Sequence, residues 1–259
     1  MARCAVSWDD ASMRLLVTGI GDAFSAIHFG SSGLVEASAG LVAIDCPGRV
    51  LAMYRTASER SGLPIDVQRI DDILLTHLHG DHSNGLETFG FARRYLSDRP
   101  SRPRLHALPE VLERVWEKLA PAMDGSTKGN GSGSTLEDYF DPCPMQPGAE
   151  YEVAGMTVAC RRTRHSVPTA GLLLRSDSAC LGWSGDSEFE PAHIDWLSRA
   201  DCIVHECGDH FKHTRWAELD TLPEQLQSKI RLIHLPDGAD VPEGPMRPLI
   251  EGEVVRIGS

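Results

Sequence analysis

Short apolar runs, each flanked by glycine or polar residues, recur along the chain. Runs of this length with turn-forming residues at their edges are typical of buried β-strands. The runs that predict strands are residues 13–18, 41–45, 73–76, 156–159, 171–175, 179–183, 202–205 and 230–234. Between the first two runs, glycines indicate tight turns, at Gly19, Gly21, Gly30 and Gly33.

Three other segments carry apolar residues at helical spacing. They are residues 109–119, a stretch near 192–199, and residues 217–229. The first begins with Pro109 and Glu110, as a helix often does. Strands dominate both halves of the chain and helices lie between them, which predicts one α/β domain over residues 1–259. A Gly/Ser-rich stretch at 124–134 predicts a mobile loop.

Composition narrows the class of protein. The chain has 259 residues, of which 41% are hydrophobic and 24% charged, as in an ordinary globular protein. No apolar run approaches the roughly 20 residues that cross a bilayer, and the first ten residues lack the apolar core of a secretory signal. The seven cysteines are scattered and form no CxxC pair, which favours reduced thiols in a reducing compartment. We therefore expect a cytoplasmic enzyme without a membrane partner.

The charge balance argues against a nucleic-acid partner. The formal net charge is −12, whereas a protein that binds nucleic acid through its phosphates usually presents a basic field. A local basic patch exists at Arg161, Arg162 and Arg164, and bound metal ions would add positive charge that the sequence does not count.

The segment directly after the run at 73–76 is rich in metal-binding side chains. His77, His79, Asp81 and His82 fall within six residues, and imidazole with carboxylate suits zinc, and also iron or manganese. Two histidines one residue apart can reach one metal, while the adjacent Asp-His pair reaches a second. Gly80 lets the backbone turn between the two groups. The segment therefore predicts a metal site.

Further ligands follow other apolar runs. His165, Asp186 and His234 each stand at or just beyond the carboxyl end of a predicted strand. Any one of them alone would be read as a structural or surface residue. Together with the histidine cluster they predict one site built from several strand ends.

The pattern HxHxDH resembles the signature of the metallo-β-lactamase superfamily, and the resemblance runs from Leu15 to about Leu235. It implies an α/β fold, a four-layer αββα sandwich with the site at one edge. It also implies two divalent metal ions, Zn²⁺ in the first place and Mn²⁺ or Fe as alternatives. The ligand set that it implies is His77, His79 and His165 on one metal, Asp81, His82 and His234 on the other, and Asp186 between them. Asp45 matches the aspartate that ends an early strand in this family.

Three segments are similar to the ribonuclease Z branch of this superfamily. They are the glycine loop at 19–24, the segment HSVPTAG at 165–171, and His205-Glu206-Cys207 with His213-Thr214 shortly after. In that branch the last element helps to protonate the leaving oxygen. The resemblance implies that Glu206 orients His213 and that His213 is the general acid. From the chemistry of such a site, Asp81 or Asp186 is expected to orient the attacking water. The alternative for His213 is a surface histidine that precedes a helix.

Two departures from that branch argue against transfer RNA as the substrate. His165 and Asp186 are too close in sequence to hold the long arm that grips tRNA, and the segment IHLPDG around His234 lacks the usual ending of the branch. The extra length lies near residues 105–150, which we interpret as an insert that closes over the site as a lid or forms an oligomer contact, so a homodimer is possible. Within it, Trp116, Tyr139 and Phe140 either contact substrate or pack against one another.

The sequence thus predicts a dinuclear metal-dependent hydrolase, foremost a phosphodiesterase acting on a small-molecule phosphodiester. A histidine with an ordinary pKa near 6.5 is well matched to protonating an alkoxide leaving group. Two alternatives stay open. One is hydrolysis of a lactone, thioester or carboxylic ester at the same metals, and the other is a non-catalytic, metal-bound regulator.

Overall fold

The computed structural model describes residues 13–98, 101–125 and 132–258, and it contains two seven-stranded sheets. Most of the predicted Gly/Ser loop lies outside the described residues. The first sheet has the order β14 (Val254–Ile257), β1 (Met13–Gly19), β2 (Ser32–Ala37), β3 (Gly40–Ile44), β4 (Ile70–Leu74), β5 (Arg104–Ala107), β6 (Asp141–Pro144). The second has the order β13 (Arg247–Pro248), β12 (Ile230–Ile233), β11 (Cys202–Glu206), β10 (Cys180–Trp183), β9 (Ala170–Arg175), β8 (Met156–Arg162), β7 (Glu150–Val153).

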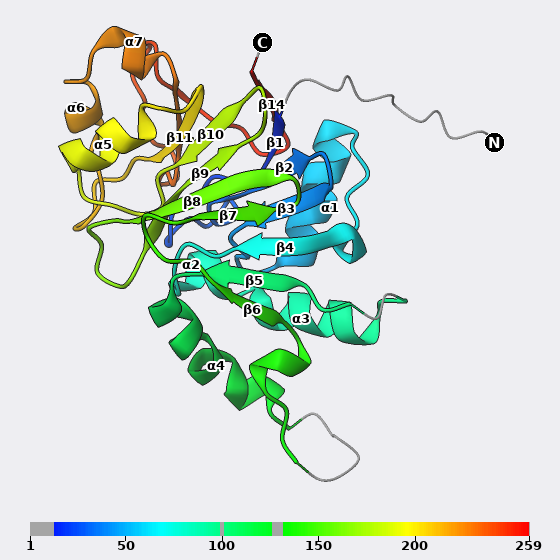
Figure 1. Cartoon of the computed structure of the whole chain (residues 1–259). Coiled ribbons are helices and arrows are strands. Elements are labelled where there is room, and N and C mark those ends of the chain that lie inside the picture. Colours follow the sequence, from blue (N-terminus) through cyan, green and yellow to red (C-terminus); the bar gives the residue numbers. More distant parts are fainter. Residues whose placement is uncertain (1–12, 99–100, 126–131, 259) are drawn as a thin grey trace.

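The two sheets pack face to face, and helices lie on their outer sides (Figure 1). Helices α1 (Val50–Ser61), α3 (Leu86–Tyr95) and α4 (Pro109–Met123) accompany the first sheet, and α5 (Pro191–Leu197) accompanies the second. The short helices are α2 (Gly80–Ser83), α6 (Trp216–Leu219) and α7 (Glu224–Gln227), with 3₁₀ turns at η1 (Val67–Arg69) and η2 (Leu136–Asp138). This arrangement confirms the predicted four-layer αββα sandwich.

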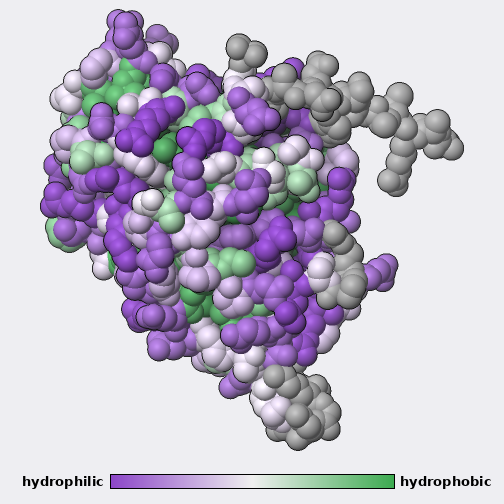
Figure 2. Space-filling view, viewed as in Figure 1, coloured by the Kyte–Doolittle hydropathy of each residue, from purple (hydrophilic) through white to green (hydrophobic). Residues whose placement is uncertain are grey.

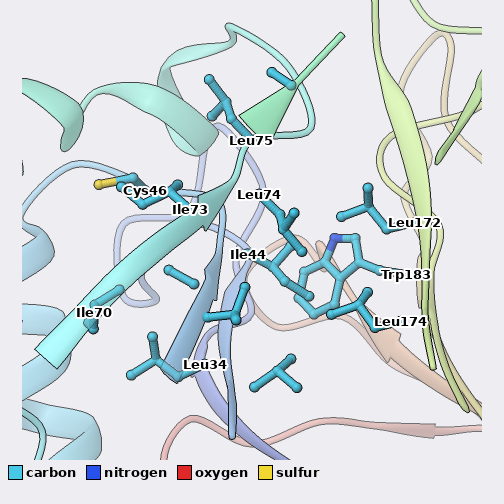
Figure 3. Packing of buried hydrophobic residues seen from close by; sticks show 14 of the residues in the cluster. Leu34, Ile44, Cys46, Ile70, Ile73, Leu74, Leu75, Leu172, Leu174 and Trp183 are labelled. Carbon is cyan, nitrogen blue, oxygen red and sulfur yellow. The ribbon is translucent and has the colours of Figure 1, made fainter. Parts of the chain in front are cut away.

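The main core lies between the sheets. Ile44 and Leu74 project from the first sheet toward Leu172, Leu174 and Trp183 of the second, and all five are almost fully buried (Figure 3). Burying one such aliphatic side chain contributes about 1.5–3 kcal/mol. A smaller cluster forms on the outer side of the second sheet, where α5 places its apolar residues against β11 and β12. One face of the surface is largely hydrophilic, with small separate hydrophobic patches (Figure 2).

Several element predictions need correction. Residues 217–229, predicted as one helix, form α6 and α7 with a break before Pro223, which has no N–H to continue a helical ladder. Gly33, predicted in a turn, lies inside β2 and pairs with Val17 and Ile44. A Cβ at Gly33 would come 2.6 Å from the Leu15 side chain, so this glycine serves close packing between strands.

The segment at 105–150 is tied into the first sheet. Strands β5 and β6 extend that sheet by parallel pairing, and α4 connects them. Tyr139 and Phe140 are buried, and Trp116 stacks on Tyr139 with ring centroids 6.3 Å apart, which matches the packing alternative for these aromatics. A lid role for this segment stays a prediction. None of the described helices is long and apolar enough to cross a membrane.

Candidate metal centre

The strand ends that carry the predicted ligands meet at one edge of the sandwich. Strands β8, β10, β11 and β12 run in the same direction, because β8 and β10 are both antiparallel to β9 and the other pairs are parallel. Their carboxyl ends therefore lie at one edge, where they deliver His165, Asp186, Glu206 and His234 in turn. From the first sheet, the chain leaving β4 brings the histidine cluster and α2 to the same place.

One group of donor atoms surrounds an oxygen of Asp186. Asp186 Oδ2 lies 3.5 Å from His77 Nε2 and 3.7 Å from His165 Nε2. His79 Nδ1 lies 3.1 Å from His165 Nε2. The ligand atoms of these four residues all lie within 4.8 Å of one another, so they are able to hold one metal ion.

A second group adjoins the first through the same aspartate. Asp81 Oδ2 lies 3.2 Å from the Nε2 atoms of both His82 and His234. Asp186 Oδ1 is 3.4 Å from His82 Nε2, and Asp186 Oδ2 is 3.5 Å from His234 Nε2. Asp186 thus faces both groups, which is the place that a bridging ligand requires.

The spacing of the donor atoms suits metal coordination better than hydrogen bonding among the side chains. Two donors that each lie about 2.1 Å from a tetrahedral Zn²⁺ are roughly 3.4 Å apart, close to the separations found here. Among the described residues, the buried Nε2 atoms of His77 and His82 make no hydrogen bond, although a buried polar atom normally has a partner. The cluster is therefore a candidate metal-binding site, and the individual ligand assignments stay predictions.

Asp45 holds this cluster from behind. Its carboxylate is fully buried and accepts hydrogen bonds from Thr76 N at 2.8 Å, Thr76 Oγ1 at 2.9 Å and His82 Nδ1 at 2.8 Å. A carboxylate on the second nitrogen of a ligating histidine fixes the ring and its tautomer. Asp45 itself adopts φ 61°, a left-handed conformation that is uncommon outside glycine. The sequence marks Asp45 by family resemblance only, and the role of Thr76 was missed although it directly precedes His77.

Backbone geometry also bears on two candidate ligands of the second sheet. His234 adopts φ 60°, and Lys212, whose carbonyl lies 3.1 Å from His165 Nδ1, adopts φ 71°. Such strained conformations persist only where the surroundings impose them, and they gather at functional sites. No sequence pattern pointed to the Lys212 carbonyl, because a backbone acceptor leaves no residue-specific signal.

Glu206 and His213 form a pair beside both metal-binding groups. His213 Nδ1 lies 3.1 Å from Glu206 Oε1, which also accepts the backbone N–H of Ser187 at 2.8 Å and of Thr214 at 3.3 Å. The His213 ring stacks on His234, with centroids 4.9 Å apart, and its side chain is only 12% exposed. This placement argues against a plain surface histidine. Donor atoms of His213, Asp186 and His234 also lie within 4.8 Å of one another, so His213 is itself close enough to serve as a ligand.

The electrostatics of His77, His165 and Asp186 favour metal binding. Although burial raises the pKa of Asp186, the surrounding histidines lower it well below the ordinary value, so the carboxylate is charged. Burial lowers the pKa of His77, and it lowers that of His165 to about 4, so both imidazoles are neutral. Ionised carboxylates and neutral imidazoles are the forms that bind metal. Burial, and next the charge of Asp186, raise the pKa of Glu206 well above its usual range.

Comparison with known proteins points to one family. The sequence model of a family described as anti-Pycsar protein Apyc1 matches residues 13–246. The anti-Pycsar protein Apyc1 of Saccharibacillus brassicae is 33% identical over 239 residues, covering 88% of this chain and 92% of that protein. A cAMP/cGMP-dependent 3′,5′-cAMP/cGMP phosphodiesterase B of Dictyostelium discoideum is 23% identical over 209 residues, covering 73% of this chain and 18% of that protein.

Solved structures agree on the fold. The metallo-β-lactamase fold protein YhfI of Bacillus subtilis superposes with a TM-score of 0.75 at 18% identity, covering 95% of this chain and 99% of that one. The short form of human tRNase Z superposes with a TM-score of 0.72 at 16% identity, covering 95% of this chain and 100% of that one. These likenesses confirm the predicted metallo-β-lactamase fold.

Proposed function

The chain belongs to the Apyc1 family of anti-Pycsar proteins, and on this premise we propose that it is a metal-dependent phosphodiesterase that hydrolyses a cyclic nucleotide. The prediction of a phosphodiesterase for a small phosphodiester agrees with the family and with the cyclic-nucleotide phosphodiesterase among the relatives. The observation that carries the proposal is the Glu206–His213 pair placed directly against the His/Asp cluster.

Two divalent ions, Zn²⁺ in the first place, are the cofactors that the donor set fits. His77, His79 and His165 would hold one ion, and Asp81, His82 and His234 the other, with Asp186 facing both. Bound there, such ions would neutralise charge on a phosphate and would lower the pKa of a coordinated water to near 7. Asp81 has its carboxylate at the second group and is the residue proposed to orient the attacking water.

The chain's own residues supply the leaving-group step. Opening a cyclic phosphodiester releases an alkoxide, which needs a proton. His213 is the proposed acid, with Nδ1 held by Glu206 so that Nε2 is the nitrogen that gives up the proton. A positioned acid of this kind typically contributes on the order of a hundred- to ten-thousandfold to the rate. An acid for a poor leaving group favours a phosphodiester over an activated carboxylic ester.

A small substrate fits the structure better than a folded RNA. Between His165 and Asp186 the described chain forms only β9 and β10, which pair as a hairpin. That interval has no room for an arm that grips tRNA, and the net charge of −12 offers little general attraction for phosphates.

The test is a comparison of substrates on metal-analysed protein. We expect about two ions per chain, turnover of 3′,5′-cyclic nucleotides to nucleoside monophosphates, and no specific trimming of precursor tRNA. Lactones, thioesters and carboxylic esters are assayed under the same metal conditions. Turnover of these esters with none of the cyclic nucleotides would overturn the proposal, and efficient 3′ trimming of tRNA would restore the RNA-processing assignment.

A further inference from the structure

A cavity of about 400 Å³ opens beside the candidate metal centre, on the side of His79. One wall is a single face of α4, because Glu110, Val111, Arg114, Glu117 and Lys118 recur at helical spacing. The volume lies within the range of roughly 300–1,000 Å³ typical of small-molecule sites. None of the residues that line it is assigned a role in the hydrolytic step except His79.

Two segments that line the cavity are adjacent in sequence to candidate metal ligands. Leu78 stands between His77 and His79, and Val167 and Pro168 follow His165 in the loop between β8 and β9. A substrate whose phosphate lies at the metal centre therefore has this cavity as the adjoining space. The wall on the α4 side is held in place by Lys118, whose Nζ donates to the Leu78 carbonyl at 2.9 Å and to Ser83 Oγ at 2.6 Å.

The lining combines apolar and charged side chains. The apolar residues are Leu78, Val111, Val167 and Pro168, and the charged ones include Glu110, Arg114 and Glu117. A mostly apolar lining with a few polar groups is typical of small-molecule sites, and a nucleobase offers the matching surfaces, with apolar ring faces and an edge that carries donors and acceptors. Arg114 also has a planar guanidinium that stacks on aromatic rings.

Arg114 is available for such a contact. Its side chain is 64% exposed, and its ion pair with Glu117 spans 3.6 Å between two exposed groups. Exposed pairs of this type are weak because water screens them, so a bound ring would displace the pair at little cost. Resting on the proposed function, we propose that the base of the cyclic nucleotide binds in this cavity, between the Val167–Pro168 loop and α4, with Arg114 against the ring.

Two variants test this placement from two different lining segments. Val167→Trp fills the cavity from the loop, and Arg114→Ala removes the stacking group from α4. The matched control is Arg55→Ala on α1, another exposed arginine, whose pair with Glu59 spans 4.0 Å and which lies outside the cavity.

Turnover is compared on two diesters, a 3′,5′-cyclic nucleotide and methyl 4-nitrophenyl phosphate, which has no base. We expect both cavity variants to lower kcat/KM for the cyclic nucleotide by about tenfold or more, mainly through KM, and to change that for the baseless diester by less than about twofold. Arg55→Ala leaves both unchanged. An equal loss on the two diesters, or no loss on either, overturns the base site.

A binding measurement tests the base site independently of the proposed hydrolysis. The metal-loaded protein is titrated with a nucleoside 5′-monophosphate and with ribose 5-phosphate, neither of which is a diester. We expect the wild type to bind the nucleotide at least tenfold more tightly, and the two cavity variants to lose that difference. If cyclic nucleotides are not hydrolysed but this difference is found, the function fails and the base site stands. Equal affinities for the two ligands in the wild type refute the base site even where hydrolysis occurs.

Discussion

The first sheet brings its candidate ligands from one continuous loop, whereas the second brings one residue from each of several strand ends. His77 to His82 follow β4 within a single turn of chain and α2. His165, Asp186 and His234 are far apart in sequence and meet only because β8, β10 and β12 end at the same edge. The first half is therefore a local motif, and the second is a product of topology.

The supporting carboxylates differ in a parallel way. Asp45, behind the loop of the first sheet, uses both oxygens to accept hydrogen bonds from Thr76 and His82. Glu206, behind the second sheet's contribution, gathers all its hydrogen bonds on Oε1, and its Oε2 is buried without one. We infer that Asp45 fixes the ligands, while Glu206 fixes a group that acts on the substrate.

The largest effect is expected where the two contributions join. Asp186→Asn should remove most bound metal and reduce hydrolysis to background, because its two oxygens face donor atoms from both sheets. Metal content by mass spectrometry and turnover of a cyclic nucleotide measure this, with circular dichroism to check the fold. Asp195→Asn, the same change at an exposed position on α5, is the control. Unchanged metal content in Asp186→Asn would mean that Asp186 does not join the donor atoms of the two sheets, and it would refute a shared metal site.

A smaller effect is expected for His213, the residue proposed to act on the substrate. His213→Ala should slow hydrolysis of a cyclic nucleotide on the order of a hundred- to ten-thousandfold, with metal content close to wild type. The loss should be much smaller for a nitrophenolate leaving group, which needs no proton. His210→Ala, an exposed histidine in the same loop, serves as control. A uniform loss across leaving groups would rule out the general-acid role, and a loss of metal would make His213 a ligand.

The difference between the two sheets also explains which parts of the candidate site could be predicted from the sequence. Four candidate ligands within His77–His82 form a recognisable local motif, and the strand before them was predicted within a few residues of β4. His165, Asp186 and His234 were identified because each follows an apolar run, but only the direction of the strands shows that those runs end together. A hydrogen bond to a backbone carbonyl has no residue-specific signal in the sequence, so the contact of the Lys212 carbonyl with His165 was not predicted. The break at Pro223 was missed because apolar spacing alone suggested a continuous helix.

The two supporting carboxylates give a third, more moderate test. Asp45→Asn would turn an amide N–H₂ toward Thr76 or His82, both of which donate to Asp45. We expect metal affinity or activity to fall about 10–100-fold and the free energy of unfolding to fall by about 1–3 kcal/mol. Metal titration and denaturant unfolding measure the two quantities.

Glu206→Gln is the counterpart to that change. Its amide nitrogen can occupy the side of the unpaired Oε2, while the remaining oxygen keeps the hydrogen bonds that Oε1 now accepts. We expect turnover to fall by less than in His213→Ala, with metal affinity near wild type. A loss of metal in Glu206→Gln as large as in Asp45→Asn would remove the distinction between the two carboxylates.

The smallest effect concerns the frame of the first sheet, away from the metal centre. Asp72 on β4 accepts hydrogen bonds from His106 Nε2 at 2.7 Å and from Arg104 Nε at 2.6 Å, both on β5. Burial raises the pKa of Asp72, but these two partners outweigh it and hold the pKa below its ordinary value. The charged carboxylate therefore contributes stability above a pH of about 4, the ordinary range of an aspartate, and that contribution is lost as the pH falls through the lowered pKa.

We expect Asp72→Asn to cost about 1–3 kcal/mol in the free energy of unfolding at neutral pH, less as the pH falls below about 4, with metal content and turnover unchanged. Denaturant unfolding at several pH values measures it. A cost that stays the same at low pH would mean that packing, and not the charge of Asp72, joins β4 to β5, and a loss of metal would show that this frame positions the histidine loop as well.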